Sequence, residues 1–194
     1  MNILIVNFDK CYNHGGVIQA WALQNTLKSM GHNVEKAEVP QATKYPPHKL
    51  KLAWTIAKRI RRRYLIGDKT IDIFKEFKEN DYAYLPHYKV MRFIRKHLSI
   101  ITVNSMNELN REKYDAVIVG SDQIWRRRYT CNKRLLTDKT ACDNGFLAFT
   151  KDWDCKRIAY AASVGVDYWE YTAEETKALK ELIKNFDAIS VREA

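Results

Sequence analysis

One segment with residues suited to chemistry lies near the start of the sequence, where Cys11–Leu27 reads CYNHGGVIQAWALQNTL. His14 has a side chain that titrates near neutral pH, so it could act as a general acid or base. Gly15 and Gly16, two of only seven glycines in the chain, would let a ligand approach the backbone amides at the start of a helix. A tight turn and a surface histidine explain the same residues without a ligand. The segment alone leaves both interpretations open.

A second candidate group follows the apolar run YDAVIVG at residues 114–120. Polar groups just after a strand of a parallel sheet lie where ligands bind, so Ser121, Asp122 and Gln123 could bind a hydroxyl group or move a proton. The same residues could instead cap the N-terminus of a following helix. Neither segment forms a GxGxxG fingerprint or a P-loop, so a nicotinamide or ATP site has no direct support.

The elements that would position these groups alternate between strand and helix patterns. Short apolar runs predict strands at residues 2–8, 33–39, 114–120, 157–163 and 187–191. Helices are expected at residues 17–30, 105–113 and 172–185. Gly31 would stop the first helix, and the other two open with the capping boxes Ser105–Glu108 and Thr172–Glu175. This alternation predicts an α/β fold with a doubly wound, mostly parallel, Rossmann-like sheet.

The middle of the chain, residues 45–98, is rich in Lys and Arg and has no strand pattern. It predicts a helix with one apolar face over residues 49–64 and two shorter helices at 70–78 and 88–97. We expect residues 1–194 to form one Rossmann-like domain with a helical insertion at about 45–113. The apolar face of the long basic helix could pack on the sheet or contact a membrane surface.

Composition narrows the classes of protein that the chain could belong to. The 194 residues are 46% hydrophobic, and 33 basic residues against 23 acidic ones give a net charge of +10, which favours an anionic partner. The four cysteines form no CxxC pair, so we expect neither a metal site nor a disulfide framework. The sequence has no apolar segment of membrane-spanning length, and we expect a cytoplasmic protein.

Four blocks, taken together and in order, resemble a known family. They are YNHGGVIQAWALQNTLKSMGHNVE, YDAVIVGSDQIW, KRIAYAASVG and FDAISVRE, and they look like the N-terminal half of the polysaccharide pyruvyl transferase family. The resemblance implies one half of a two-domain arrangement like that of the GT-B glycosyltransferases, with the C-terminal domain absent and this chain alone weak or inactive. It implies phosphoenolpyruvate as the donor substrate, with no further cofactor. The implied acceptor is a sugar of a cell-surface polysaccharide or a lipid-linked glycan, handled at or near the inner membrane surface.

The resemblance also assigns roles to residues of this chain. It implies substrate contacts for Asn13, Gly15, Gly16, Gln19, Ser121, Gln123 and Arg192. The candidates for proton transfer are Asp122, which follows a strand end, and His14, whose titration range suits the role. Arg192 is the candidate contact for the donor's anionic groups. The chain departs from the family pattern at His14 and Gly16, where an aromatic and a small apolar residue are common. It departs again at residues 126–128, where three arginines replace a common Asn-Pro.

Other interpretations of the chain remain open at this point. It could be a non-catalytic module that binds a sugar or an anion, a truncated remnant, or half of a GT-B-like glycosyltransferase. A partner chain or a second copy could complete the site. Nucleic acid is not an expected partner, because the arginine clusters lie in no recognised nucleic-acid-binding fold.

Overall fold

The computed structural model of the chain describes residues 1–7, 14–39, 49–68, 71, 73, 89–120, 122–130 and 141–193. The chain divides into two compact units. Unit 1 comprises residues 1–41 and 92–194 and contains the whole sheet, while unit 2 comprises residues 42–91. The helical insertion expected at about 45–113 therefore extends past unit 2, into residues that belong to unit 1.

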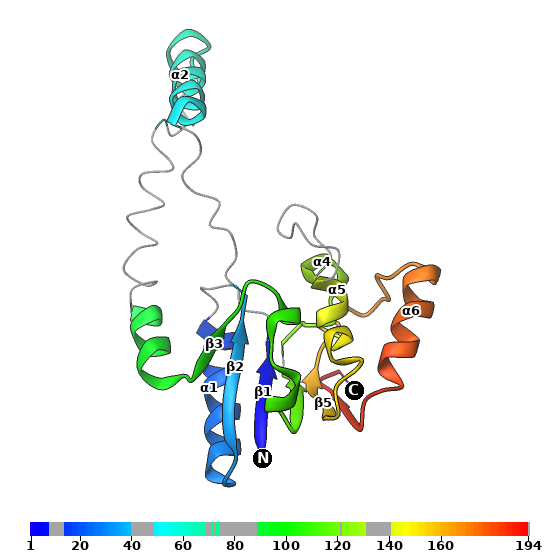
Figure 1. The fold of residues 1–194 in the computed structure, drawn as a ribbon. Helices are drawn as coiled ribbons and strands as arrows, with labels where there is room; N and C mark the ends of the chain where they lie inside the picture. The colour runs from blue at the N-terminus through cyan, green and yellow to red at the C-terminus, as the bar shows by residue number, and fades with distance from the viewer. Residues whose placement is uncertain are drawn as a thin grey trace. The chain divides into compact units, whose positions relative to one another are not determined.

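Unit 1 is built on a sheet of six parallel strands (Figure 1). The strands are β1 (Asn2–Val6), β2 (Asn33–Glu38), β3 (Ile100–Thr102), β4 (Ala116–Val119), β5 (Lys156–Ala162) and β6 (Ala188–Val191). Their order across the sheet is β3-β2-β1-β4-β5-β6, with every neighbouring pair parallel. This is the order of a Rossmann sheet, whose switch point lies between β1 and β4. The α/β fold predicted from the sequence is confirmed.

Two longer helices of unit 1 lie where the sequence predicts them, although the first begins at His14 rather than at Val17, so that Gly15 and Gly16 lie in its first turn instead of in a loop. Helix α1 (His14–Ser29) returns from the end of β1 to the start of β2, and Gly31 follows it with φ +87°, in the left-handed region that favours glycine. Helix α6 (Ala173–Ile183) opens with the predicted capping box. The Thr172 hydroxyl accepts from the Glu175 amide at 3.2 Å, and the Glu175 carboxylate accepts from the Thr172 amide at 2.8 Å. Neighbouring residues therefore fix the C-terminal end of α1 and the N-terminal end of α6.

Helices cover both faces of the sheet because its strands are apolar on both sides. Ile3, Ile5 and Val34 point to the face that packs on Leu23 and Leu27 of α1. The opposite face carries the larger core cluster, which includes Leu4, Val117 and Ala159 of the strands, Trp125 and Phe146 of the connections, and Leu179 of α6. The sheet is the middle of three layers.

A buried glutamine connects α1 to the edge of the sheet. Gln24 has no exposed surface, and its side-chain amide donates to the Ser99 carbonyl at 2.9 Å while its oxygen accepts from the Ser99 amide at 2.9 Å. Lys28 donates to the Ser99 hydroxyl at 2.7 Å. These bonds hold the residue just before β3, so that β3 can pair with β2.

One sequence prediction is wrong in this region, and one strand was not predicted. The expected helix over 105–113 is instead a pair of 3-10 turns, η1 (Met106–Glu108) and η2 (Arg111–Lys113). Glu108 bonds the Asn104 amide at 3.0 Å rather than completing a capping box with Ser105, and extended backbone at Leu109 and Asn110 separates the turns. Strand β3, which pairs with β2, was not predicted; it lies just after residues 45–98, the stretch without a strand pattern.

The remaining short elements of unit 1 are α4 (Arg127–Thr130), α5 (Ala141–Asn144) and η3 (Ala148–Thr150). Unit 2 contains α2 (Lys49–Leu65), which matches the predicted basic helix. Residues 89–97 are also helical, as expected, while the helix predicted at 70–78 lies outside the described residues apart from 71 and 73. Among the helices that the structure describes, none has the length and apolarity needed to cross a membrane.

Candidate functional site

The loops that follow β1, β4, β5 and β6 meet at the carboxyl edge of the sheet. The Gly120 amide donates to the Asn7 side-chain oxygen at 3.1 Å, which links the ends of β4 and β1. The Ser163 amide donates to the Asp122 carbonyl at 3.1 Å, and the Trp125 amide donates to the Ser163 carbonyl at 3.1 Å. The segment after β4 is therefore bonded to the segment after β5 along its backbone.

The core anchors the loop after β4. Ile124 is fully buried and Trp125 nearly so, and the Trp125 indole donates to the Gly145 carbonyl at 2.8 Å while its ring stacks on Phe146 with centroids 5.3 Å apart. The Tyr171 hydroxyl donates to the Trp125 carbonyl at 3.1 Å. Because these contacts fix Ile124 and Trp125, the two residues before them, Asp122 and Gln123, are held at the sheet edge.

Five side chains gather at this edge from three loops, and we refer to them as the edge cluster: Gln123, Arg126, Ser163, Arg192 and Glu193. At its centre Ser163 has no exposed surface. The Ser163 hydroxyl donates to the Glu193 carboxylate and accepts from Nη2 of Arg192 at 3.1 Å. The edge cluster thus joins the end of β5 to the end of β6 through one buried hydroxyl.

The other half of the edge cluster is formed by Gln123 and Arg126. The Arg126 guanidinium donates to Oε1 of Gln123 at 2.9 Å, and its Nε lies 3.9 Å from a carboxylate oxygen of Glu170. Gly165 packs against Gln123 so closely that a Cβ atom on it would lie 2.5 Å from the Gln123 Cδ atom. The Gly165 amide also donates to Glu193 at 3.2 Å. Gly165 therefore connects the two halves of the edge cluster.

A β-bulge directs the end of β5 into the edge cluster. The register of β5 against β6 shifts between Ala159 and Ala162, and Ala161 takes φ +51°, which is uncommon for a residue other than glycine. The bulge lets Ala159 and Ala162 face the same core even though they are three residues apart. It sets the position of Ser163, the next residue.

The charges of the edge cluster suit an anionic ligand beside a hydroxyl group. The hydrogen bond from Ser163 is the main cause that lowers the pKa of Glu193, and the Gly165 amide and the Arg192 charge lower it further. Glu193 is therefore a carboxylate at neutral pH and can accept a hydrogen bond from a sugar hydroxyl. The bond to Ser163 uses one of the five N–H groups of a guanidinium, and guanidinium groups bind carboxylates and phosphates.

Comparison with known proteins decides the family. A model of the family described as polysaccharide pyruvyl transferase matches residues 13–194. The chain belongs to this family. Neither the search of curated proteins nor the search of solved structures gives a match.

In this pyruvyl transferase family member, the predicted site residues fall into two groups. Gln123 and Arg192 lie in the edge cluster, and Asp122 is bonded to Ser163 through its backbone carbonyl while its carboxylate accepts from the Gln123 amide at 2.7 Å. Helix α4 starts only at Arg127, so no helix begins directly after Asp122 for it to cap.

The second group lies in the first turns of α1. The helix follows β1 and runs back along the sheet, so these turns start on the carboxyl-edge side. His14 and Gly15 are exposed, Gly16 is buried and Gln19 is half-buried. Asn13 and Ser121 lie outside the described residues.

The sequence analysis missed three members of the edge cluster: Arg126, Ser163 and Glu193. Ser163 and Glu193 stand in blocks that it did quote, ASVG and SVRE, and each follows a predicted strand. The rule that polar residues after parallel strands face the ligand edge would have selected both. Arg126 was noted only as a departure from the family pattern.

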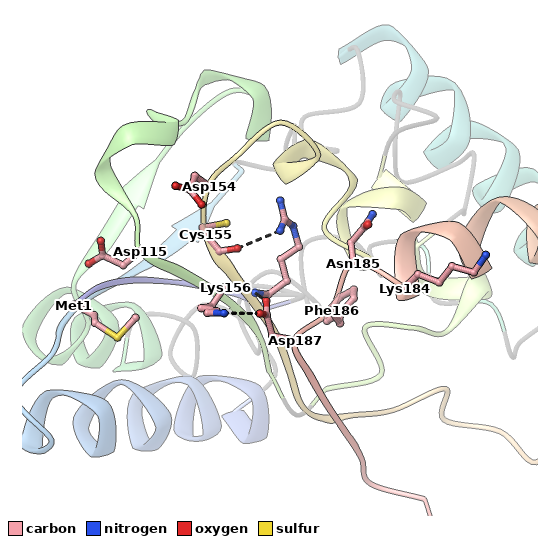
Figure 2. Close-up of a pocket in the computed structure, with 10 residues that line it drawn as sticks. Met1, Asp115, Asp154, Cys155, Lys156, Lys184, Asn185, Phe186 and Asp187 are labelled. Carbon is pink, nitrogen blue, oxygen red and sulfur yellow. Dashed lines mark hydrogen bonds and ion pairs between the residues drawn. The ribbon is translucent and has the colours of Figure 1, made fainter.

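The cavity in Figure 2 lies at the opposite, amino edge of the sheet of this family member. It measures about 540 Å³, and its lining includes Asp115 and Asp187, which precede β4 and β6, and Lys156, the first residue of β5. Lys156 donates to the Asp187 carboxylate at 2.9 Å, which lowers the pKa of Asp187, and the Arg157 amide donates to the same carboxylate at 2.8 Å. Burial raises the pKa of the nearby Cys155 thiol. The bonds from Lys156 and Arg157 to Asp187 connect the start of β5 to the start of β6.

The described residues contain no group of three or more His, Cys, Asp or Glu side chains that could hold a metal ion.

Proposed function

We propose that this chain takes part in transferring a pyruvyl group from phosphoenolpyruvate to a hydroxyl of a sugar in a cell-surface polysaccharide or its precursor. Membership of the family supports the reaction class. The observation that carries the assignment of a site is the edge cluster, in which Arg192 and Glu193 meet at the buried Ser163 hydroxyl. It offers a cation for the donor and a hydrogen-bond acceptor for a sugar, side by side at the ligand edge of a Rossmann sheet.

The proposed reaction assigns these groups separate tasks. A proton is added to the methylene carbon of phosphoenolpyruvate, and the cation that forms at the neighbouring carbon is attacked by a sugar hydroxyl, which loses its proton. A second sugar hydroxyl then displaces phosphate and closes a cyclic ketal. Arg192 would hold the donor's carboxylate or phosphate, and Glu193 would accept a hydrogen bond or proton from the attacking hydroxyl. His14 is the proposed proton donor, with Asp122 as the alternative group for proton transfer.

The test is an assay of phosphate release from phosphoenolpyruvate in the presence of candidate glycans. We expect Arg192→Ala to lower kcat/KM by about 10- to 100-fold, as for loss of a charge-assisted hydrogen bond. Arg111→Ala is the matched control, because Arg111 is exposed in η2, just before β4 at the amino edge. Equal losses in both variants would remove Arg192 from the proposed site.

A second measurement separates an enzyme from a binding module. Titration calorimetry with phosphoenolpyruvate reports binding independently of turnover. Binding that depends on Arg192 without any phosphate release would favour a non-catalytic anion-binding module, the alternative raised by the sequence. Release that depends on a glycan would favour the transferase.

A further inference from the structure

Helix α2 of unit 2 exposes its apolar face. Trp54 is 66% exposed, Tyr64 73% and Leu65 78%, and Ala53, Ala57 and Ile60 on the same face are exposed as well. These residues recur every three or four positions, so they form one continuous stripe along the helix. Large exposed apolar side chains grouped in this way are typical of a surface that binds another protein or a membrane.

The opposite side of α2 is the one that contacts the protein. Thr55, Ile56, Arg59 and Arg63 are only half-exposed, and Arg63 donates to the Ile71 carbonyl at 2.8 Å. A helix at the surface of a globular protein normally turns its apolar stripe inward and its charges outward. In α2, Arg59 and Arg63 lie on the half-exposed side, whereas Trp54 and Tyr64 are exposed.

The charge on α2 has a single sign. Its seventeen residues include seven Lys or Arg and no Asp or Glu. Lys58, Arg61 and Arg62 are exposed beside the apolar stripe, and the Lys58 ammonium lies 5.2 Å from the centre of the Trp54 ring. The exposed surface of α2 is therefore an apolar stripe with a cationic border.

We propose that α2 binds an anionic lipid surface and lies along it, with its apolar stripe in the boundary between head groups and acyl chains. A large apolar face, a basic polar face and low mean hydropathy characterise helices of this kind, and Trp and Tyr favour the membrane interface. A second copy of α2 is a poor occupant, because each helix carries seven positive charges and no negative one, so two copies would repel each other. Charge complementarity selects an anionic surface, and this inference does not depend on the proposed transferase activity.

The test is flotation of the full chain with lipid vesicles. We expect binding to phosphatidylcholine vesicles that contain about a quarter phosphatidylglycerol, little binding to pure phosphatidylcholine, and loss of binding when NaCl rises from about 0.05 M to about 0.5 M. The double variant Lys58→Glu/Arg61→Glu should bind at least about 30-fold more weakly, from about fivefold for each cation lost. The control is Lys177→Glu/Lys180→Glu, which removes the same net charge from exposed positions of α6.

A second readout tests whether the apolar stripe inserts. Vesicles with brominated acyl chains quench tryptophans that enter the bilayer, and the chain has five tryptophans. We expect quenching in the wild type that disappears in Trp54→Phe, while the vesicle binding of that variant persists.

Several outcomes would overturn the proposal. They are absence of binding to the anionic vesicles, equal loss of binding in both charge variants, and quenching that survives Trp54→Phe. A change from dimer to monomer on Trp54→Phe, seen by light scattering, would assign the stripe to a second copy of the chain instead. Phosphate release is not measured in these experiments, so their failure leaves the proposed function unaffected.

Discussion

Ser163 shows how an uncharged residue can organise charged ones. Its hydroxyl is buried between the Arg192 guanidinium and the Glu193 carboxylate, and its backbone bonds both Asp122 and Trp125. An unbridged cation and anion at an exposed sheet edge would interact weakly, because water screens them. The buried hydroxyl holds both side chains in one geometry, so that Arg192 would already be oriented for the anion of the proposed reaction.

Gly165 gives a prediction at the residue scale. It has φ +69°, and an added Cβ would collide with the Gln123 side chain. We expect Gly165→Ala to lower the free energy of unfolding by more than the roughly 1–2 kcal/mol that a left-handed alanine costs, because Gln123 must also move. Since Gln123 bonds Arg126, phosphoenolpyruvate affinity should fall too.

Gly31→Ala is the control for that variant. Gly31 has a similar φ of +87°, but an added Cβ would have no atom within 4 Å. Denaturant unfolding of both variants, with calorimetric titration of phosphoenolpyruvate, separates backbone strain from the collision with Gln123. Equal destabilisation and equal affinity in the two variants would mean that Gly165 has no special role in the edge cluster.

At the scale of elements, α1 and β3 depend on one buried side chain. Gln24→Ala would leave the amide and the carbonyl of Ser99 without their bonds to Gln24. We expect a loss of about 1–2 kcal/mol in the free energy of unfolding, because the Ser99 amide loses its partner while the Ser99 carbonyl keeps the bond from the Lys36 amide at 2.9 Å. Urea denaturation measures it.

Asn25→Ala, at the next and exposed position of α1, is the matched control and should change stability by less than about 0.5 kcal/mol. A Gln24→Ala variant as stable as this control would contradict the role of Gln24 as the tie between α1 and β3.

Glu175 connects α6 to α4 and makes their contact sensitive to pH. Arg127 donates to both Glu175 oxygens, at 2.7 and 2.9 Å, and these hydrogen bonds are the main cause that lowers the pKa of Glu175 to about 2. Since the folded-state pKa lies below the ordinary value of 4.5, the unfolded chain binds more protons between those values. The stabilisation is therefore complete above about pH 4.5 and is lost as the pH falls toward 2.

The corresponding prediction compares wild type with Glu175→Gln, which keeps an oxygen for the Thr172 amide. Because the pair is partly exposed, we expect the wild type to be more stable at neutral pH by only about 1 kcal/mol, and the difference to shrink below about pH 4.5 and vanish as the pH falls toward 2. Urea unfolding at a series of pH values measures this difference, with Glu174→Gln as the control at the neighbouring exposed position. A difference that stays constant with pH would show that the ion pair does not contribute.

The elements that the sequence predicted are those whose signals are local. The capping box at Thr172, the stop at Gly31 and the apolar strands depend on neighbouring residues, and the structure confirms them. Strand β3 has only three residues, and the residue before it is held by Gln24, which is distant in sequence. Residues 105–108 have the residue types of a capping box, but no helix follows them. The backbone is extended at Leu109 and Asn110, where the predicted helix would have continued.

The candidate site was predicted only in part, because only some of its residues belong to a local sequence pattern. A strand followed by polar residues is a local pattern, so Asp122, Gln123 and Arg192 could be selected from the sequence. That Ser163 is buried between Arg192 and Glu193 follows from the bulge at Ala161 and from β5 pairing with β6. These are long-range contacts, which no window of sequence contains. The buried Lys36 in β2, with its pKa lowered to about 8 by burial, was likewise invisible to a local pattern.

At the scale of the whole molecule, the two units differ in what stabilises them. Both core clusters draw all their residues from unit 1. In unit 2 the described helix α2 exposes its apolar stripe. The sheet and the edge cluster should therefore fold without most of unit 2, whereas binding to anionic vesicles should require it.

A variant in which a flexible Gly/Ser linker replaces residues 42–88 tests this division. The linker leaves helix 89–97 intact, so that Phe93 keeps its contact with Trp21, at 5.9 Å between ring centres. We expect a single cooperative thermal transition with a midpoint within about 4 °C of the wild type, since about 1 kcal/mol shifts a domain of this size by that much. Binding to anionic vesicles should be lost, while phosphoenolpyruvate titration should give the wild-type affinity. If the variant has native far-ultraviolet circular dichroism but no cooperative transition, the sheet needs unit 2 for its packing. If vesicle binding survives the replacement, the lipid contact lies elsewhere on the chain.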